Sequence, residues 1–293
     1  MPNPPPLLSA TIVSMKLSRR HWLLLATTSL AAATREEEKV TRYVRFQHGS
    51  NVSYGILEGD LVYPISGDLF GQYKRSSSPL KLRETKLLCP CQPQKVLAVG
   101  LNYRSHLAGR PVPKRPEIFY KPVTSLQHPG DPILIPPDAH NVHYEGEMVI
   151  VLGKRLKRAS LDEAAEAIFG VTCGNDVSER EWQNGPDRDL QWWRAKGCDT
   201  FGPVGPCIVR GLDYRKLMLR TRLNGQVVQE QSTGDLIFDP PTILSWISQY
   251  VTLMPGDLVF TGTPGQTGSI KPGDVVEVEL EGVGVLRNPV ERG

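Results

Sequence analysis

The sequence predicts a mixed α+β fold that is mainly β, a mixed barrel or sandwich with a few helices. Short apolar runs of strand length outnumber the stretches that have helical periodicity. The 27 glycines and 25 prolines punctuate the whole chain, which suits many short strands better than long helices. No G-x-G-x-x-G motif follows a predicted strand and no P-loop is present, so a doubly wound α/β sheet is not indicated.

The first 33 residues have the layout of an export signal. A basic region precedes a mostly apolar run at 22–30, and three alanines at 31–33 suit a cleavage site. The basic residues are Lys16, Arg19 and Arg20, which with their neighbours resemble a twin-arginine signal. The apolar run is shorter than the roughly 20 residues that span a bilayer, so we expect an exported, periplasmic protein without a stable membrane anchor. The alternative is a disordered leader on a cytoplasmic protein, and Met15 is a second candidate for the start.

The charge of the chain outside this leader is balanced. Three of the 34 basic residues lie in 1–33 together with no acidic residue, which leaves 31 basic against 31 acidic residues. A neutral body lacks the basic surface that a polyanion requires, so we expect no nucleic-acid partner. The five cysteines have no regular spacing, which predicts neither a disulfide framework nor a zinc site.

Residues 40–88 predict a small β-meander domain. Three runs of strand character are separated by turn sequences that contain glycine. These runs are 42–46, 53–57 and 61–65. The serine-rich segment 74–79 is predicted to be a linker that closes this domain, with a boundary near residue 90 and a larger domain at 95–290.

The larger domain is predicted to begin with a buried strand at 96–99 that ends in Gly100. The polar and aromatic residues at 101–106 follow directly, and such groups just past a strand end often line a cleft. The proline-rich segment 109–116 is predicted to be a loop, and 117–120 a second strand, which Lys121 and Pro122 end.

Two glutamates precede the most apolar stretch of the chain. Residues 148–152 are aliphatic and end at a glycine, which predicts a strand that is covered on both faces. Because side chains alternate along a strand, Glu145 and Glu147 point the same way. Two like charges side by side are tolerated only with a cation or a raised pKa. The alternative is a solvated strand end with two exposed glutamates.

Two helices and a final β region complete the predicted elements. Ser160 and Glu163 form a capping box for a helix over 160–170, and Asp239 before two prolines begins another. Strands are predicted at 258–261, 275–280 and 283–286, and the last two form a hairpin.

Asp176 ends an apolar strand-like run and is a candidate third carboxylate. The 29 residues that separate it from Glu147 include a predicted helix, so two strands of one sheet bring Asp176 to Glu145 and Glu147. Three carboxylates form an all-oxygen site for a hard divalent cation, Mg²⁺, Mn²⁺ or Ca²⁺, rather than for zinc. The alternative is that Asp176 is a turn or cap residue.

The segment 180–203 carries cationic, amide and aromatic side chains that suit an anionic ligand. A lysine such as Lys196, held near a metal and away from water, stabilises the negative charge that develops in chemistry beside a carbonyl. For Arg180 and Lys196 the alternative is a surface salt bridge, and for at least one of the tryptophans it is core packing.

Five blocks of the sequence together resemble the fumarylacetoacetate hydrolase family, in the family's order, over residues 95 to 290. The blocks are 100–106, 144–147, 175–183, 196–201 and 255–264. The resemblance implies a distorted mixed β-roll as catalytic domain, a homodimer, and a bound Mg²⁺ or another divalent ion. It also implies that Glu145, Glu147 and Asp176 are the metal ligands.

The same resemblance assigns roles to further residues. Lys196 would polarise the carbonyl of a small oxo-acid substrate, and His106 would be the general base. The residues implied to contact the substrate are Tyr103, Lys121, Arg180, Gln183 and Thr263. In many relatives a glutamate three residues after the histidine orients it, whereas here that position is Gly109.

The departure at Gly109 keeps several reactions open. Without an orienting carboxylate His106 is a weaker base, which puts water activation in doubt. The sequence therefore predicts a metal-dependent enzyme for a 2-oxo or 1,3-dicarbonyl acid, which catalyses C–C hydrolysis, or keto-enol isomerisation or decarboxylation as in 2-hydroxyhepta-2,4-diene-1,7-dioate isomerase. A non-catalytic exported binding protein for a small 2-oxo acid is the alternative.

Overall fold

The computed structural model describes residues 39–293, which belong to one compact unit. The strands are β1 Thr41–His48, β2 Asn51–Glu58, β3 Leu61–Gly67, β4 Tyr73–Arg75, β5 Leu80–Lys81, β6 Lys86–Leu88, β7 Val96–Gly100, β8 Glu117–Lys121, β9 Leu126–Gln127, β10 Ile133–Ile135, β11 Val142–His143, β12 Gly146–Leu152, β13 Ile168–Asn175, β14 Ser178–Glu179, β15 Gly202–Arg210, β16 Met218–Leu223, β17 Gln226–Ser232, β18 Leu258–Phe260, β19 Val275–Leu280 and β20 Gly284–Arg292. The α-helices are α1 Leu161–Glu166, α2 Arg180–Asn184, α3 Trp193–Gly197 and α4 Pro240–Tyr250. Short 3₁₀ helices are η1 Leu82–Glu84, η2 Arg104–His106, η3 Val123–Ser125 and η4 Thr233–Asp235.

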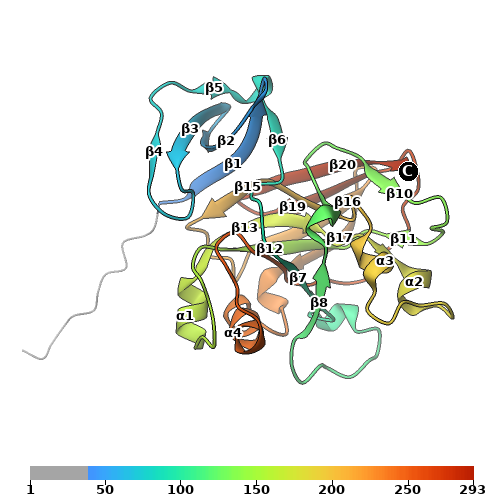
Figure 1. Ribbon diagram of the computed structural model, residues 1–293. Coiled ribbons are helices and arrows are strands. Elements are labelled where there is room, and N and C mark those ends of the chain that lie inside the picture. Colours follow the sequence, from blue (N-terminus) through green and yellow to red (C-terminus); the bar gives the residue numbers. More distant parts are fainter. Residues whose placement is uncertain (1–38) are drawn as a thin grey trace, which may run out of the picture. The chain divides into compact units, whose positions relative to one another are not determined.

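The main sheet runs through most of this unit. Its central path has the order β4-β3-β2-β1-β15-β13-β12-β18-β7-β8, and it is open at both ends (Figure 1). Neighbouring strands along this path are antiparallel except for β18 and β7. The predicted mainly β class is confirmed, with mixed sheets and no closed barrel among the described strands. The predicted meander of β1, β2 and β3 joins this sheet through the pairing of β1 with β15.

A second sheet has the order β10-β20-β19-β16-β17. Apolar side chains from it pack with side chains of the main sheet in one core cluster, which includes Met148 and Cys173 from β12 and β13 and Leu219 and Val278 from β16 and β19. Packing of two sheets through their apolar faces removes both faces from water. This cluster holds the strands that carry the candidate carboxylates in a rigid position.

Helices α1 and α4 cover a different stretch of β12, closer to its C-terminal end. Ile150 and Leu152 of β12 pack with Ala164 of α1 and with Ile243 and Ile247 of α4. Val149 and Val151, the alternate residues of the strand, belong to a different core cluster. The predicted strand that is buried on both faces is therefore confirmed, since every residue of β12 is buried.

The helix predicted over 160–170 is shorter than expected. The capping box is present, because Ser160 accepts from the Glu163 amide and Glu163 accepts from the Ser160 amide. The helix ends at Glu166, and Gly170 lies within β13 opposite Val151. A Cβ atom at Gly170 would lie 2.5 Å from the carbonyl oxygen of Val209 on β15. Close strand packing, rather than the end of a helix, therefore explains this glycine.

Two further expectations about the chain require correction or completion. The segment predicted as a linker, 74–79, is partly strand, because β4 pairs with β3 and places Arg75 opposite Ile65. The β16–β17 hairpin was not predicted, although its turn is Asn224-Gly225, the strongest short hairpin signal. The predicted helix after Asp239 is confirmed as α4, with Asp239 accepting from the Thr242 amide.

The remaining expectations concern the leader, the cysteines and the membrane. The predicted leader at 1–33 lies outside the described residues and stays a prediction. All five cysteines are free. No helix in the described part of the chain is long and apolar enough to cross a membrane.

Candidate metal and active site

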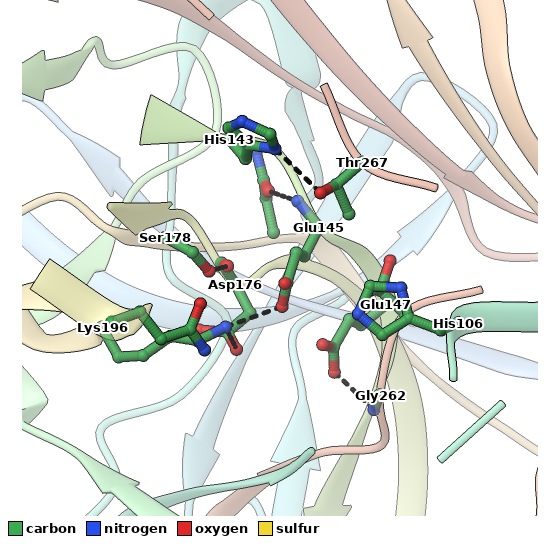
Figure 2. Close-up of polar contacts among 12 residues, drawn as sticks. His106, His143, Glu145, Glu147, Asp176, Ser178, Lys196, Gly262 and Thr267 are labelled. Atoms are coloured by element: carbon green, nitrogen blue, oxygen red, sulfur yellow. Dashed lines mark hydrogen bonds and ion pairs between the residues drawn. The ribbon is translucent and has the colours of Figure 1, made fainter. Parts of the chain in front are cut away.

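The pairing of β12 with β13 brings the three predicted carboxylates together. Gly146 lies opposite Asn175, and the Asp176 amide donates to the Glu145 carbonyl at 2.9 Å. One oxygen from each of Glu145, Glu147 and Asp176 lies within 4.8 Å of the others. The three residues are only 5%, 1% and 1% exposed. The alternatives of a solvated strand end and of a simple turn aspartate are therefore wrong, and Figure 2 shows the three groups facing one another.

Two lysines bind Asp176 from opposite sides. Lys196 of α3 donates to Asp176 Oδ2 at 2.6 Å and to Glu145 Oε2 at 2.7 Å. Lys121 at the end of β8 donates to Asp176 Oδ1 at 2.6 Å and to the carbonyl oxygen of Lys196. Lys121 therefore fixes both the carboxylate and the backbone of the lysine beside it. Neither ion pair is at the surface, since both lysine side chains are buried.

Arg180 supplies the third cation of the site. Its guanidinium donates to Glu145 Oε1 at 2.6 Å, to Thr267 Oγ1 at 2.7 Å and to Gln183 Oε1 at 2.7 Å. The start of α2 places it, because Glu179 precedes Arg180 and accepts from the Trp182 amide as helix cap. Arg180 and Gln183 therefore come to the site as a hydrogen-bonded pair from one turn of helix.

Charge and burial shift the pKa values of the glutamates in opposite directions. Burial raises the pKa of Glu147 well above its ordinary value, and the negative charges of Asp176 and Glu145 add to the effect. Burial alone would also raise the pKa of Glu145, but the cations of Lys196 and Arg180 outweigh it and hold this pKa below its ordinary value. Glu147 has no basic partner within residues 39–293 and accepts only from the Gly262 amide, at 2.6 Å.

The two lysines also differ. Burial would lower the pKa of Lys196, but the charges of Asp176 and Glu145 outweigh burial and raise it. Burial lowers the pKa of Lys121, and Asp176 offsets this only in part. The carboxylates thus favour the charged form of Lys196 more than that of Lys121.

The segment after β18 forms one wall of the site. Thr263 donates from Oγ1 to the Gly146 carbonyl at 2.9 Å and accepts from Gln229 Nε2 at 2.9 Å. Gly262, with φ 102°, turns its amide to Glu147, and a Cβ at this position would lie 2.8 Å from Asn102 Cβ. Only glycine fits this backbone, so its presence is tied to the carboxylate that it binds.

His106 of η2 lies against this same segment. Its Nδ1 lies 2.6 Å from the carbonyl oxygen of Gly265. Gly109 stands where many relatives have a glutamate. It has φ 82° and follows Ala108, which has φ 49°. The left-handed backbone at both positions suits a glycine and turns the chain sharply after the histidine.

One cavity of about 750 Å³ gathers most of the predicted residues. The predicted residues that line it are His106, Glu145, Glu147, Asp176, Arg180, Gln183, Lys196 and Thr263. Tyr103 and Lys121 do not line it, since Tyr103 is fully buried and Lys121 lies behind Asp176. Contact of these two residues with a substrate stays a prediction.

The residues fit a hard divalent cation. Three buried carboxylates offer only oxygen, the donor set that Mg²⁺ and Mn²⁺ prefer. Glu147 lacks a cation, and the hydroxyl of Tyr103 is buried without a hydrogen-bond partner in the described chain. Burial raises the pKa of that hydroxyl, and the charge of Glu147 adds to the shift. A bound ion and its water molecules would supply the positive charge that Glu147 lacks and the hydrogen-bond partner that the Tyr103 hydroxyl lacks.

Several residues of the site were not predicted from sequence. Gln229 reaches Thr263 and the Pro264 carbonyl from β17 of the overlooked hairpin. Thr267 accepts a hydrogen bond from Arg180. It also contacts the His143 ring (Figure 2). The Asn-Gly turn could have located the hairpin, but no local signal distinguishes Thr267 from other loop residues.

Comparison with known proteins agrees with this geometry. The family model described as "Fumarylacetoacetate (FAA) hydrolase C-terminal" matches residues 95–291, and the model "Rv2993c-like, N-terminal" matches residues 41–90. The chain has 40% sequence identity to 2-hydroxyhepta-2,4-diene-1,7-dioate isomerase from Mycobacterium marinum. The crystal structure of that protein superposes with a TM-score of 0.80 and covers 86% of this chain and 98% of that one. It is 39% identical over 220 residues to the mitochondrial oxaloacetate tautomerase FAHD2A of Bos taurus, which covers 71% of this chain and 70% of that protein. It is 26% identical to maleylpyruvate hydrolase from Sphingobium sp. SYK-6 in complex with manganese(II) ion and pyruvate, with a TM-score of 0.71 over 86% and 99% of the two chains.

Proposed function

The chain belongs to the fumarylacetoacetate hydrolase family, and on this premise we propose that it is a metal-dependent enzyme that interconverts the keto and enol forms of a 2-oxo acid. The observation that carries the proposal is the ammonium group of Lys196, which lies on two of three clustered carboxylates in the wall of the cavity that His106 also lines. The isomerase and the tautomerase among the similar proteins support this reaction class ahead of hydrolysis.

Lys196 would stabilise the charge that develops on the substrate. An ammonium group has three N–H donors, and Glu145 and Asp176 accept two of them. The third donor remains for the carbonyl oxygen of a 2-oxo acid. This oxygen gains negative charge as a proton leaves the neighbouring carbon, and a buried donor at that oxygen lowers the barrier.

Glu145, Glu147 and Asp176 would hold a divalent ion, for which we propose Mg²⁺, with Mn²⁺ or Ca²⁺ as alternatives. When bound, the ion supplies positive charge to the same substrate oxygens. The manganese in the related maleylpyruvate hydrolase supports a divalent ion here.

His106 would move the proton. Its Nε2 takes the proton from the carbon next to the carbonyl, and the electron pair of the broken C–H bond forms the enol double bond. The same nitrogen then gives that proton to the oxygen, so that tautomerisation is balanced without a further reactant. Arg180, Gln183 and Thr263 line the cavity and would orient the substrate's carboxylate.

C–C bond hydrolysis is the second candidate reaction. The similarity to maleylpyruvate hydrolase favours it, and His106 would then take a proton from water rather than from carbon. The two reactions share the metal and Lys196 and differ in what the base deprotonates.

Assays on the purified protein separate these possibilities. We expect Mg²⁺-dependent exchange between the keto and enol forms of oxaloacetate or of a 2-hydroxy-dienoate, with slower cleavage of an acylpyruvate and slower release of CO₂ from oxaloacetate. Faster cleavage than exchange would favour hydrolysis. Tight binding of oxalate, an enolate mimic, without turnover of any 2-oxo acid would contradict the proposal and favour a non-catalytic binding protein.

Two properties of the whole protein are also proposed. We expect a homodimer, as the family resemblance implies, and a mass near twice that of the purified chain by light scattering would support it. We expect export, because residues 1–33 have the layout of a signal, and the N-terminal sequence of protein from fractionated cells tests it.

A further inference from the structure

The base of the proposed reaction has a partner that comes from the backbone. Nδ1 of His106 and the carbonyl oxygen of Gly265 are 2.6 Å apart. A carbonyl oxygen only accepts hydrogen bonds, so in the neutral ring Nδ1 carries the proton and Nε2 carries the lone pair. Nε2 makes no hydrogen bond to any residue in 39–293, and His106 lines the cavity, so this lone pair remains for the substrate.

A second contact holds Gly265 in place. The Gly265 amide donates to Ser105 Oγ at 2.9 Å, and Ser105 Oγ donates to Gln231 Oε1 at 2.6 Å. Gln231 in turn donates to Asp235 Oδ2 at 3.0 Å. Because the hydroxyl proton of Ser105 goes to Gln231, its lone pair is directed to the Gly265 amide.

Neighbouring residues of η2 thus bind the two polar groups of one glycine. Ser105 accepts from its amide, and His106 donates to its carbonyl. Gly265 has φ 61°, a left-handed conformation that glycine adopts without steric cost. We propose that the Gly265 carbonyl orients His106 in place of the missing carboxylate, and that Ser105 is the positioning residue that holds this carbonyl.

The nature of the partner has a chemical consequence, which rests on the proposed function. A carboxylate would both orient the ring and stabilise the imidazolium ion that forms when Nε2 takes a proton. A neutral carbonyl orients the ring equally well but stabilises that positive charge less. His106 is therefore arranged for removing a proton from a carbon already acidified by its neighbouring carbonyl, more than for activating water.

The tautomer of His106 provides a test that is independent of turnover. In protein labelled with ¹⁵N-histidine, with His106 assigned through His106→Gln, we expect the proton on Nδ1 in wild type. Ser105→Ala removes the hydrogen bond that holds the Gly265 amide, so we expect a mixture of the two His106 tautomers. Ser105→Thr keeps the hydroxyl and restores the wild-type spectrum, and Ser77→Ala, at an exposed serine without a hydrogen bond, leaves it unchanged.

Kinetics supply the second readout. We expect Ser105→Ala to lower kcat on the order of tenfold, part of the contribution of a general base, with KM and Mg²⁺ affinity unchanged. A proton on Nε2 in wild type, or an unaltered tautomer and kcat in Ser105→Ala, overturns the proposal. If no 2-oxo acid is turned over but the tautomer responds as described, the proposed function fails and the positioning role stands. If Ser105→Ala does not fold, the wild-type tautomer still decides.

Discussion

The ammonium nitrogen of Lys196 lies 2.6 Å from Oδ2 of Asp176, and both side chains are almost completely buried. A buried charge is stable only with partners, and this pair belongs to a network with Lys121 and Glu145. The network leaves Glu147 as the carboxylate without a cation among the described residues. The site thus combines a buried ammonium group, held by two carboxylates, with a third carboxylate that has no such partner.

Lys196→Met tests the role of the ammonium group. We expect kcat for keto-enol exchange to fall by roughly 10²–10³-fold, the effect of removing one donor that stabilises a developing oxyanion. Mg²⁺ affinity should stay equal or become tighter, because a cation that competes for Glu145 and Asp176 is gone. Steady-state kinetics and calorimetry measure the two effects. Lys154→Met, at an exposed lysine, is the control, and unchanged kcat in Lys196→Met would exclude the assigned role.

Glu147→Gln tests the metal site. Without the ion, burial and two negative neighbours raise the pKa of Glu147, so folding must protonate this group or bury its charge at neutral pH. Glutamine removes that cost while it can still accept from the Gly262 amide, so we expect a higher Tm for the ion-free protein. We expect Mg²⁺ affinity to fall by at least 10-fold, as for loss of a ligand. Glu291→Gln, at an exposed position, is the control, and a variant that binds Mg²⁺ like wild type would remove Glu147 from the ligand set.

Gly262→Ala tests the backbone that supports Glu147. The new Cβ would lie 2.8 Å from Asn102 Cβ at a φ of 102°, so strain and overpacking combine. We expect the free energy of unfolding to fall by roughly 2–5 kcal/mol in urea titrations. Gly225→Ala has φ 82° but open space around the Cβ, and should cost roughly 1–2 kcal/mol for the backbone alone. Equal losses in both variants would show that the contact with Asn102 relaxes.

His128→Asn tests a pH-dependent contact outside the site. The Cys89 amide donates to His128 Nδ1 at 3.0 Å, and burial lowers the pKa of this ring. The unfolded chain therefore binds the proton first as pH falls below about 6.5, so stability is full above that pH and declines below it. We expect the free energy of unfolding of His128→Asn to decline less than that of wild type between pH 7 and pH 5. His48→Asn, at an exposed ring without a hydrogen bond, should decline like wild type, and parallel curves for all three proteins would contradict the prediction.

Local signals predicted many elements of this fold. The unbroken aliphatic run that ends at a glycine located β12, the Ser160 capping box located the start of α1, and Asp239 located the start of α4. They failed where one residue type suits two structures. The pattern places Gly170 at the end of a helix, but Gly170 lies in β13, where β15 approaches it closely. Sequence periodicity does not contain the position of a neighbouring strand.

The features of the site also separate into those that local sequence predicts and those that depend on the tertiary structure. Side-chain alternation in a strand was enough to place Glu145 and Glu147 on one side, because that geometry depends only on neighbours in the chain. Which carboxylate pairs with which cation, and which group hydrogen-bonds His106, depended on the tertiary structure. Gly265 lies 159 residues from His106, and Lys196 lies 51 residues from Glu145. The sequence by itself identified most of the charged side chains that line the cavity. Only the packing of sheets and loops decided which charges are neutralised and which ring nitrogen is free, because these depend on distances between segments that no local pattern encodes.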